Sequence, residues 1–373
     1  MIIGAGMTGL SAGYHLKKGG LDRFVVLSDG QAGASRKAAG LLLGGLMDQY
    51  TRIEHAYGGQ IAKEMWAFGD SCLGQLALFS KDLKSVKKLA RLRLIVSKEE
   101  LAEAQVATSA MQKAGFDTAL LTRKDQAAPW EHLGQRVLAI HREGVGAYLA
   151  DTGEILEKLA SPIKEKVMTG HNIRLVIRKD GALVLGDNLE ISCHMVLLAS
   201  HCGIKRLLPS LEPILIPYGD QWLDLQPDFQ ENPPDMAFSA HHGYEWGAAA
   251  PGRLLLGGGR FLRKHAGIGE SAPLVEPKVT QYLQNQLKKT FVHLKNAKVK
   301  SAQALAGLRP CDELPIIGPM FTHSQILLST GYMGSGLAMG FAGGKAISEL
   351  ILTGRCTWLP DKLHPRRLRT LEL

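Results

Sequence analysis

Cysteine is scarce in this sequence, and its spacing excludes two common uses of the residue. Five cysteines occur among 373 residues, an odd number, and no two of them form a CxxC motif. A disulfide-stabilised scaffold uses an even set of cysteines, and zinc sites usually contain closely spaced pairs. We therefore expect neither a disulfide framework nor a metal centre, and a reducing compartment is the simpler prediction.

Long hydrophobic runs are also missing. No apolar stretch reaches the roughly 20 residues that a membrane-spanning helix requires. The apolar start of the chain leads into glycines and then into Lys17 and Lys18, unlike the apolar core of a signal peptide. The sequence thus predicts a cytoplasmic protein.

Acidic residues are fewer than basic ones, 35 against 44, so the formal net charge is +9. A positive balance permits attraction to anionic small molecules, membrane surfaces or nucleic acid. Part of the excess lies in two runs, residues 81–93 and 362–369, which are most simply solvated faces. No module of basic and aromatic residues demands a nucleic acid, so we do not expect that partner, whereas peripheral membrane contact stays open.

The remaining composition is that of a globular protein, with 45% hydrophobic and 21% charged residues. The 42 glycines fall in short clusters, which favours tight turns and close approach of the backbone to a ligand. A chain of this length suits two domains. Because no repeat or low-complexity linker is present, we expect each domain to be built from separate stretches of the chain.

The beginning of the chain shows the pattern of a βαβ unit. Residues 1–3 end a short apolar strand, residues 10–18 continue as a helix that stops at Gly19, and residues 24–27 form a second apolar strand. The motif GAGMTG, residues 4–9, connects the first strand to the helix. The two strands are expected to be parallel, joined by a right-handed crossover.

A glycine motif in this position has a physical function. Gly4 permits the tight turn, and Gly6 lets the backbone approach a pyrophosphate at the helix N-terminus. Gly9 lets the helix pack closely against the strand. Met7 and Thr8 lie in the same turn. The motif therefore predicts a dinucleotide-binding site.

The end of the second strand departs from the usual pattern. An acidic residue commonly stands there and binds the adenosine ribose. Ser28 occupies that position here, and Asp29 follows one residue later. Either Asp29 takes over through a slight shift of register, or the ribose is bound less tightly than usual.

Further along the chain, periodicity predicts several elements. Residues 51–80 are expected to form one long helix, and residues 98–114 a second helix rich in Glu and Ala. Residues 91–97 alternate as a strand, and residues 173–191 contain two short strands with a turn between them. The apolar run at 195–199 is typical of a buried parallel strand.

Six motifs resemble, in the same order, segments of one enzyme family. The first is GASRKAAGL at residues 33–41. The others are GVGAYLAD at 144–151, VLLASHC at 196–202, PYGDQ at 217–221, GLRP followed by LPIIG within 307–318, and GYMGSGL at 331–337. Together they are similar to the D-amino acid oxidase, glycine oxidase and sarcosine oxidase family of FAD-dependent oxidoreductases.

This resemblance implies an α/β fold, in which an FAD-binding Rossmann-like domain of the glutathione-reductase type is interleaved with an antiparallel-sheet substrate domain. The FAD-binding domain is then expected to comprise residues 1–80, 145–211 and 303–373. The substrate-binding domain is expected to comprise residues 81–144 and 212–302.

The resemblance also indicates which residues contact FAD. In the family the GASRKAAGL segment wraps around the pyrophosphate and approaches the flavin, so Lys37 could stabilise the reduced flavin anion. The expected cofactor-binding residues are Gly4, Gly6, Met7, Thr8, Gly9, Ser28, Asp29, Ser35, Arg36, Lys37, Ala38, Ala199, Gly307, Arg309, Gly331, Tyr332, Gly334, Ser335, Gly336 and Leu337.

For the reaction, the resemblance implies hydride transfer from the carbon that bears a neutral amine to FAD, followed by hydrolysis of the imine. Arg309 matches the arginine that pairs with the substrate carboxylate in amino-acid-oxidising relatives, a task that suits a guanidinium fork. Arg260 is a second candidate, and Tyr244 and Trp246 lie where relatives place aromatic rings over the substrate. The expected substrate is a small amine or amino acid, and the expected electron acceptor is oxygen or a quinone.

Several positions differ from the family pattern. Ala38 stands where the family often has Asn, and Ser200 where it often has Gly. Cys311 invites comparison with the cysteine that binds flavin covalently in sarcosine oxidases, but Leu305 occupies the equivalent place. We therefore expect FAD to be bound non-covalently.

Two other functions stay open at this stage. The chain could be a flavin-binding subunit that is active only within a complex, which the departures at Ser28 and Ala38 favour. It could also be a flavoenzyme that modifies a tRNA side group, which the positive charge favours. The sequence does not determine the substrate, the electron acceptor or the oligomeric state.

Overall fold

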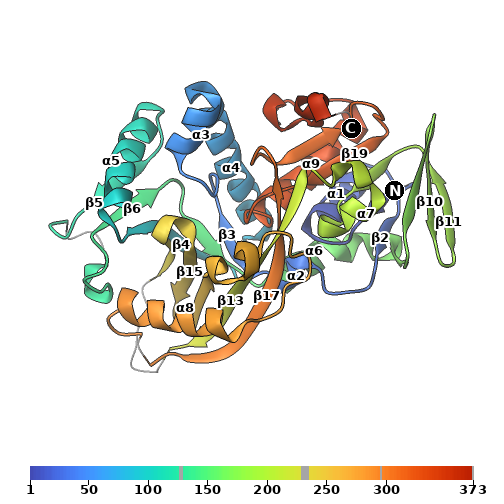
Figure 1. Ribbon diagram of the computed structural model, residues 1–373. Helices are drawn as coiled ribbons and strands as arrows, with labels where there is room; N and C mark the ends of the chain where they lie inside the picture. The colour runs from blue at the N-terminus through green and yellow to red at the C-terminus, as the bar shows by residue number, and fades with distance from the viewer. Residues whose placement is uncertain (126–128, 228–234, 295, 372–373) are drawn as a thin grey trace.

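The computed structural model describes residues 1–125, 129–227, 235–294 and 296–371. Within these ranges the strands form three sheets, of six, three and ten strands. In Figure 1 the six- and three-stranded sheets lie in the right half of the molecule, and the ten-stranded sheet extends towards the lower left. The expected combination of a Rossmann-like sheet with a second, largely antiparallel sheet is confirmed.

The predicted βαβ unit forms the centre of the six-stranded sheet. It consists of β1 (Ile2–Ile3), α1 (Met7–Lys18) and β2 (Val26–Ser28), with β1 parallel to β2. The helix ends where the N–H of Gly19 donates to the carbonyl of His15 at 2.9 Å. Neighbouring strands are parallel except at β18–β19, and the order is β18 (Ile316–Pro319), β19 (Ile326–Thr330), β12 (Val196–Leu198), β1, β2 and β8 (Val167–Thr169).

The last long helix of the chain packs against the first one. In α9 (Ala338–Thr353), Gly344 approaches α1 so closely that a Cβ there would lie 2.3 Å from the carbonyl oxygen of Thr8. The hydroxyl of Ser11 donates to the carbonyl of Phe341 at 2.6 Å. These contacts hold the N-terminus of α1, and with it the glycine motif, in a defined position.

The ten-stranded sheet is antiparallel except between β14 and β4, which are parallel. β17 crosses the predicted domain boundary between residues 302 and 303 and pairs with β13 along its whole length. The order is β17 (Lys298–Pro310), β13 (Leu215–Gln226), β16 (Arg253–Gly258), β15 (Glu245–Ala250), β14 (Met236–Ala240), β4 (Lys87–Ile95), β6 (Ala139–Glu143) and β5 (Thr118–Leu121), with β3 (Leu41–Leu43) and β7 (Ala147–Leu149) attached through β4.

The prediction of one long helix over residues 51–80 is wrong. The structure has two helices, α3 (Tyr50–Tyr57) and α4 (Gly59–Ser80), because Gly58 adopts φ +85° and interrupts the helical backbone. The apolar periodicity on either side of the break concealed it. The helix predicted at 98–114 is confirmed as α5 (Lys98–Lys113), where Ser97 accepts the N–H of Glu100 as N-cap at 3.1 Å.

The other predicted strands are confirmed, with small differences in extent. β9 (Arg174–Arg178) and β10 (Gly181–Gly186) are the two strands expected within 173–191, and β11 (Leu189–Cys193) completes this three-stranded sheet. The remaining α-helices in the described ranges are α2 (Ala34–Lys37), α6 (Thr152–Ala160), α7 (Ile204–Leu207) and α8 (Pro277–Thr290). In the part of the chain that the structure describes, no helix combines the length and apolar character needed to span a membrane.

Candidate active site

A cavity of about 1930 Å³ lies between the glycine motif and the inner face of the ten-stranded sheet. Ligand pockets for a single small molecule usually enclose about 300–1,000 Å³. The cavity is therefore large enough for a dinucleotide and a second small molecule. One end is lined by β1, β2 and the start of α1, and the other by β13, β15 and β17.

The glycine motif has the geometry that its spacing predicted. Gly4 adopts φ +118°, and a Cβ at this position would lie 2.4 Å from the carbonyl oxygen of Ala199. A Cβ at Gly9 would lie 1.8 Å from the carbonyl oxygen of Gly4. A larger residue at either position would thus displace backbone. Gly6 differs, because a Cβ there would meet only the hydroxyl of Ser35, at 3.1 Å, and Gly6 lines the cavity.

The N-terminus of α1 faces this end of the cavity. The N–H of Met7 donates to the Ser35 hydroxyl at 3.0 Å, which ties the glycine motif to α2. No acidic residue occupies the first turn of α1. Free N–H groups at a helix N-terminus attract phosphate, and Arg36 lines the cavity beside them.

The end of β2 carries two side chains that cap the following turn. The Ser28 hydroxyl accepts the N–H of Gly30 at 3.1 Å, and Asp29 Oδ1 accepts the N–H of Gln31 at 3.0 Å. Both residues line the cavity. Asp29 Oδ2 is not used in this turn, so it could accept a hydrogen bond from a ribose hydroxyl.

Tyr332 lines the cavity beside the start of α1. Its hydroxyl forms hydrogen bonds with the hydroxyl of Thr8 at 3.1 Å and with that of Ser329 at 2.7 Å. Burial raises the pKa of the Tyr332 hydroxyl above its ordinary value, so it stays protonated. The glycine-rich turn that follows is thereby tied directly to the start of α1.

The cavity brings together most residues that the sequence assigned to the cofactor. Those that line it are Gly4, Gly6, Met7, Thr8, Ser28, Asp29, Ser35, Arg36, Ala38, Ala199, Gly307, Arg309, Tyr332, Gly334, Gly336 and Leu337. Gly9, Lys37, Gly331 and Ser335 are not part of this lining. The carbonyl of Lys37 accepts the indole N–H of Trp222 at 3.2 Å, and neither residue lines the cavity.

The two candidate arginines differ in their surroundings. Arg309, at the end of β17, forms an ion pair with Glu313 four residues later. Arg260 lies over the rings of Tyr218 and Tyr244, with its guanidinium carbon 5.6 and 5.3 Å from their centroids. Among the described residues, no carboxylate forms an ion pair with Arg260. The sequence singled out Arg309, Arg260 and Tyr244 as site residues, whereas Tyr218 appeared only as part of the PYGDQ motif.

Asp220 is a site residue that the sequence did not assign. It lies on β13 and lines the cavity, with Oδ1 accepting the N–H of Gln221 at 2.8 Å and Oδ2 accepting the indole N–H of Trp246 at 3.1 Å. Burial raises the pKa of the Asp220 carboxyl above its ordinary value. Asp220 stands within the PYGDQ motif, which supported the family resemblance but was given no residue in the site.

Tyr218, also unassigned by the sequence, lies two residues before Asp220 on the same face of β13. Gly307 stands opposite Tyr218 on β17, and a Cβ at Gly307 would lie within 2.1–2.5 Å of the ring. Gly257 makes similar room for the ring of Trp246. Burial raises the pKa of the Tyr218 hydroxyl to about 12. The glycines thus allow two aromatic rings to lie flat at the substrate end.

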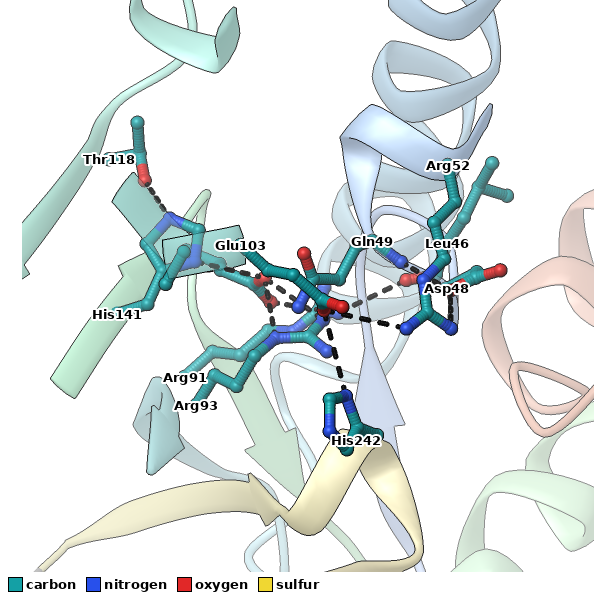
Figure 2. Close-up of polar contacts among 12 residues, drawn as sticks. Leu46, Asp48, Gln49, Arg52, Arg91, Arg93, Glu103, Thr118, His141 and His242 are labelled. Atoms are coloured by element: carbon teal, nitrogen blue, oxygen red, sulfur yellow. Dashed lines mark hydrogen bonds and ion pairs between the residues drawn. The ribbon is translucent and has the colours of Figure 1, made fainter. Parts of the chain in front are cut away.

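A second polar cluster lines the same cavity at the β4 end of the sheet (Figure 2). Glu143 lies between Arg91 and Arg93, at 3.3 and 3.0 Å, and all three are nearly inaccessible to solvent. Burial alone would raise the pKa of Glu143, but the two guanidiniums lower this pKa to about 2. Arg91 also donates to the carbonyls of Gly44 and Leu46, so this cluster clamps the loop before α3.

Figure 2 also shows Glu103 between Arg52 and His242 at the cavity wall. Glu103 Oε2 lies 3.4 Å from Arg52 Nη2 and 3.6 Å from His242 Nδ1. Arg52 pairs in addition with Asp48 at 3.4 Å. This network connects α3, α5 and the turn after β14, and it gives Arg52 two carboxylate partners.

The residues present fit FAD. Gly6 leaves open the space that a Cβ would fill beside the helix N-terminus, which suits a pyrophosphate. The hydroxyl of Ser200 is buried at the cavity wall, and no described protein group forms a hydrogen bond with it, which leaves it for a ligand. Leu305 lines the cavity, whereas Cys311 is exposed and does not, so non-covalent binding remains our expectation.

The fold and the cavity define a dinucleotide-binding α/β protein whose cofactor site adjoins a second ligand site. A family model described as FAD dependent oxidoreductase (DAO) matches residues 1–350 of the 373. The chain belongs to this family, which confirms the expected class of enzyme and its cofactor. No curated protein sequence matches the chain.

Solved structures with the same fold cover nearly the whole chain. Glycine oxidase from Geobacillus kaustophilus has a TM-score of 0.78 at 14% identity, over 97% of this chain and 96% of that one. L-proline dehydrogenase from P. horikoshii has a TM-score of 0.76 at 18% identity, over 99% and 97%. L-amino acid deaminase from Proteus vulgaris has a TM-score of 0.75 at 14% identity, over 98% and 96%.

Proposed function

We propose that this FAD-dependent oxidoreductase oxidises a small amino acid, and that Arg260 binds the substrate carboxylate. The observation that carries the proposal is the position of Arg260 at the cavity between two tyrosine rings, without an ion pair to any described carboxylate. A guanidinium presents paired donors that match a carboxylate. The names of similar structures, which include a glycine oxidase and an L-proline dehydrogenase, support this class of substrate.

Arg309 is the weaker of the two candidates, although the family resemblance favoured it. Its ion pair with Glu313 must break before it can bind a substrate carboxylate. An exchange of one carboxylate for another yields little net free energy, because the new ion pair only replaces an existing one. Binding to Arg260 requires no such exchange.

The aromatic residues orient the substrate between the sheet and the cofactor. The rings of Tyr218 and Tyr244 both lie against the guanidinium of Arg260, and Trp246 lines the cavity next to Asp220. FAD, when bound, supplies the acceptor for the hydride of the substrate. The protein contributes position, because a fixed distance between the reacting carbon and the cofactor replaces a costly encounter in solution.

The test is an anaerobic screen of the purified protein for flavin bleaching by amino acids and simple amines. We expect bleaching by at least one small amino acid and weaker bleaching by the amine that lacks its carboxylate. Glycine with methylamine, and L-proline with pyrrolidine, are matched pairs. Equal rates within each pair would show that the carboxylate is not recognised. No bleaching by any compound would refute the proposed function.

A further inference from the structure

Asp220 is a carboxyl group at the substrate end of the cavity without a cationic partner. Its oxygens accept hydrogen bonds from Gln221 and Trp246, at 2.8 and 3.1 Å, and no described cation forms an ion pair with it. Asp220 is partly buried, and a carboxylate with reduced access to water is costly unless a cation or a proton compensates its charge. The site thus lacks one positive charge beside Asp220, and the substrate can supply it.

Arg260 and Asp220 together match a zwitterion. Tyr218 connects the two residues. Its ring lies against the guanidinium of Arg260, and its side chain is on the same face of β13 as that of Asp220, two residues away. Arg260 and Asp220 both line the cavity, and Arg260 is close enough to Asp220 to favour its ionised form, so a substrate carboxylate at Arg260 would place the ammonium group of the same molecule towards Asp220. Trp222, two residues further along this face, donates to the carbonyl of Lys37, which places the row of side chains next to the cofactor segment.

We propose that Asp220 accepts the proton of the substrate ammonium group and so produces the neutral amine that is oxidised. This inference rests on the proposed function. The N–H bond of the ammonium breaks, and an O–H bond forms on the Asp220 carboxylate. With FAD bound, the Cα–H bond would then break, and its electron pair would leave with the hydride, so that FAD would take up two electrons. The nitrogen lone pair forms the C=N bond of the iminium product.

The charges around Asp220 support this role. Arg260 and Arg263 both favour the ionised carboxylate, but Arg263 is held by Glu270 and Glu276 at 2.9 and 3.0 Å. When the substrate carboxylate neutralises Arg260, the carboxylate of Asp220 loses part of that stabilisation and becomes a stronger base. Proton acceptance is therefore coupled to substrate binding. The other groups near this part of the cavity are Tyr218, Trp246, Arg309 and Glu313.

The decisive experiment is stopped-flow flavin reduction by the best amino acid of the screen, as a function of pH. In the wild type the rate should rise as Asp220 ionises and then stay level. In Asp220→Asn it should fall about 100-fold at pH 7 and rise tenfold per pH unit until the substrate amine loses its own proton, where it approaches the wild-type rate. Asp220→Glu should restore the wild-type shape of the profile.

A binding measurement removes the reaction from the test. The amino acid 2-aminoisobutyrate has no α-hydrogen, and pivalate is its counterpart with a methyl group in place of the amine. Perturbation of the flavin spectrum should show that the wild type prefers 2-aminoisobutyrate, and that this preference is lost at a pH low enough to protonate Asp220. Asp220→Asn should not show the preference at any pH.

The outcomes separate this inference from the proposed function. Rates of Asp220→Asn that equal the wild type, or that are lower by the same factor at every pH, would overturn the role of Asp220 while amino-acid oxidation stands. If Asp220→Asn does not retain FAD, the wild type alone tests the role of Asp220: a preference for 2-aminoisobutyrate over pivalate that does not change with pH would overturn it. A wild-type flavin that no amino acid or amine reduces would overturn the proposed function, and with it this inference.

Discussion

Replacement of Gly6 by alanine tests the cofactor site with little disturbance of the fold. Gly6 has φ −84°, an ordinary value for any residue, and the added Cβ would meet only the Ser35 hydroxyl, at 3.1 Å. A shift of a few tenths of an ångström in that side chain relieves the contact. We expect the free energy of unfolding of the FAD-free protein to fall by less than about 1 kcal/mol, as for a mild substitution.

The effect on FAD should be much larger. The new methyl group would occupy the space beside the N-terminus of α1, where the pyrophosphate approaches the backbone. Loss of one charge-assisted hydrogen bond costs about 1.5–3 kcal/mol, which corresponds to a Kd increase of roughly 10- to 150-fold. The assay is titration of the FAD-free protein with FAD, followed by flavin fluorescence, together with thermal unfolding.

Two further glycines serve as controls. At Gly74 on α4 a Cβ would meet nothing within 4 Å, so Gly74→Ala should leave FAD binding unchanged and stabilise the helix by up to about 1 kcal/mol. Gly9→Ala should damage the fold itself, because its Cβ would lie 1.8 Å from the Gly4 carbonyl. A Gly6→Ala protein that binds FAD as tightly as the wild type would refute the assignment of the pyrophosphate site.

Three other predictions follow from the site. Arg260→Ala should lower kcat/KM for an amino acid by a factor that corresponds to a loss of about 2–5 kcal/mol in transition-state stabilisation, with normal FAD content. Arg309→Ala should lower kcat/KM by a smaller factor. If steady-state kinetics show the reverse order, Arg309 rather than Arg260 binds the substrate carboxylate. Ser28→Glu should tighten FAD binding about tenfold or more if Asp29 does not hold the ribose; no change, with a large loss in Asp29→Ala, would show that Asp29 does. The pKa of Glu143 is about 2 in the folded protein and 4.5 ordinarily, so the stability that its ionised form provides is present above pH 4.5 and lost as the pH falls towards 2. Glu143→Gln should lower the free energy of unfolding at pH 7 by about 3–5 kcal/mol in chemical denaturation. A variant as stable as the wild type would contradict this prediction.

Local chemistry determined the beginning of the chain. The glycine motif, the apolar strands beside it and the stop at Gly19 act over a few residues, so the βαβ unit and its dinucleotide site could be predicted from sequence alone. The helix α5 is a similar case, since Ser97 and Glu100 mark its start through short-range hydrogen bonds. The order of the six motifs then led to the family, and so to the cofactor.

The sequence was ambiguous over residues 51–80, where the helical periodicity of apolar residues favours one helix and Gly58 permits a break. The prediction of one helix over residues 51–80 took no account of Gly58, whose positive φ separates α3 from α4 in the structure. Helix periodicity continues across such a break, because apolar residues on both sides face the same core. Only packing distinguishes one long helix from two.

The substrate end was decided by tertiary structure. Asp220 and Trp246 lie on different strands, and Arg260 meets Tyr218 only because β13 and the turn after β16 fold over the same cavity. Likewise, the resemblance made Arg309 the first candidate for the substrate carboxylate, and the structure shows that Glu313 forms an ion pair with it. Sequence motifs record which residues are present, but a charge acts through its nearest neighbours in space. Which arginine is free, and which carboxyl group lacks a cation, could therefore be seen only after the sheet had brought these strands together.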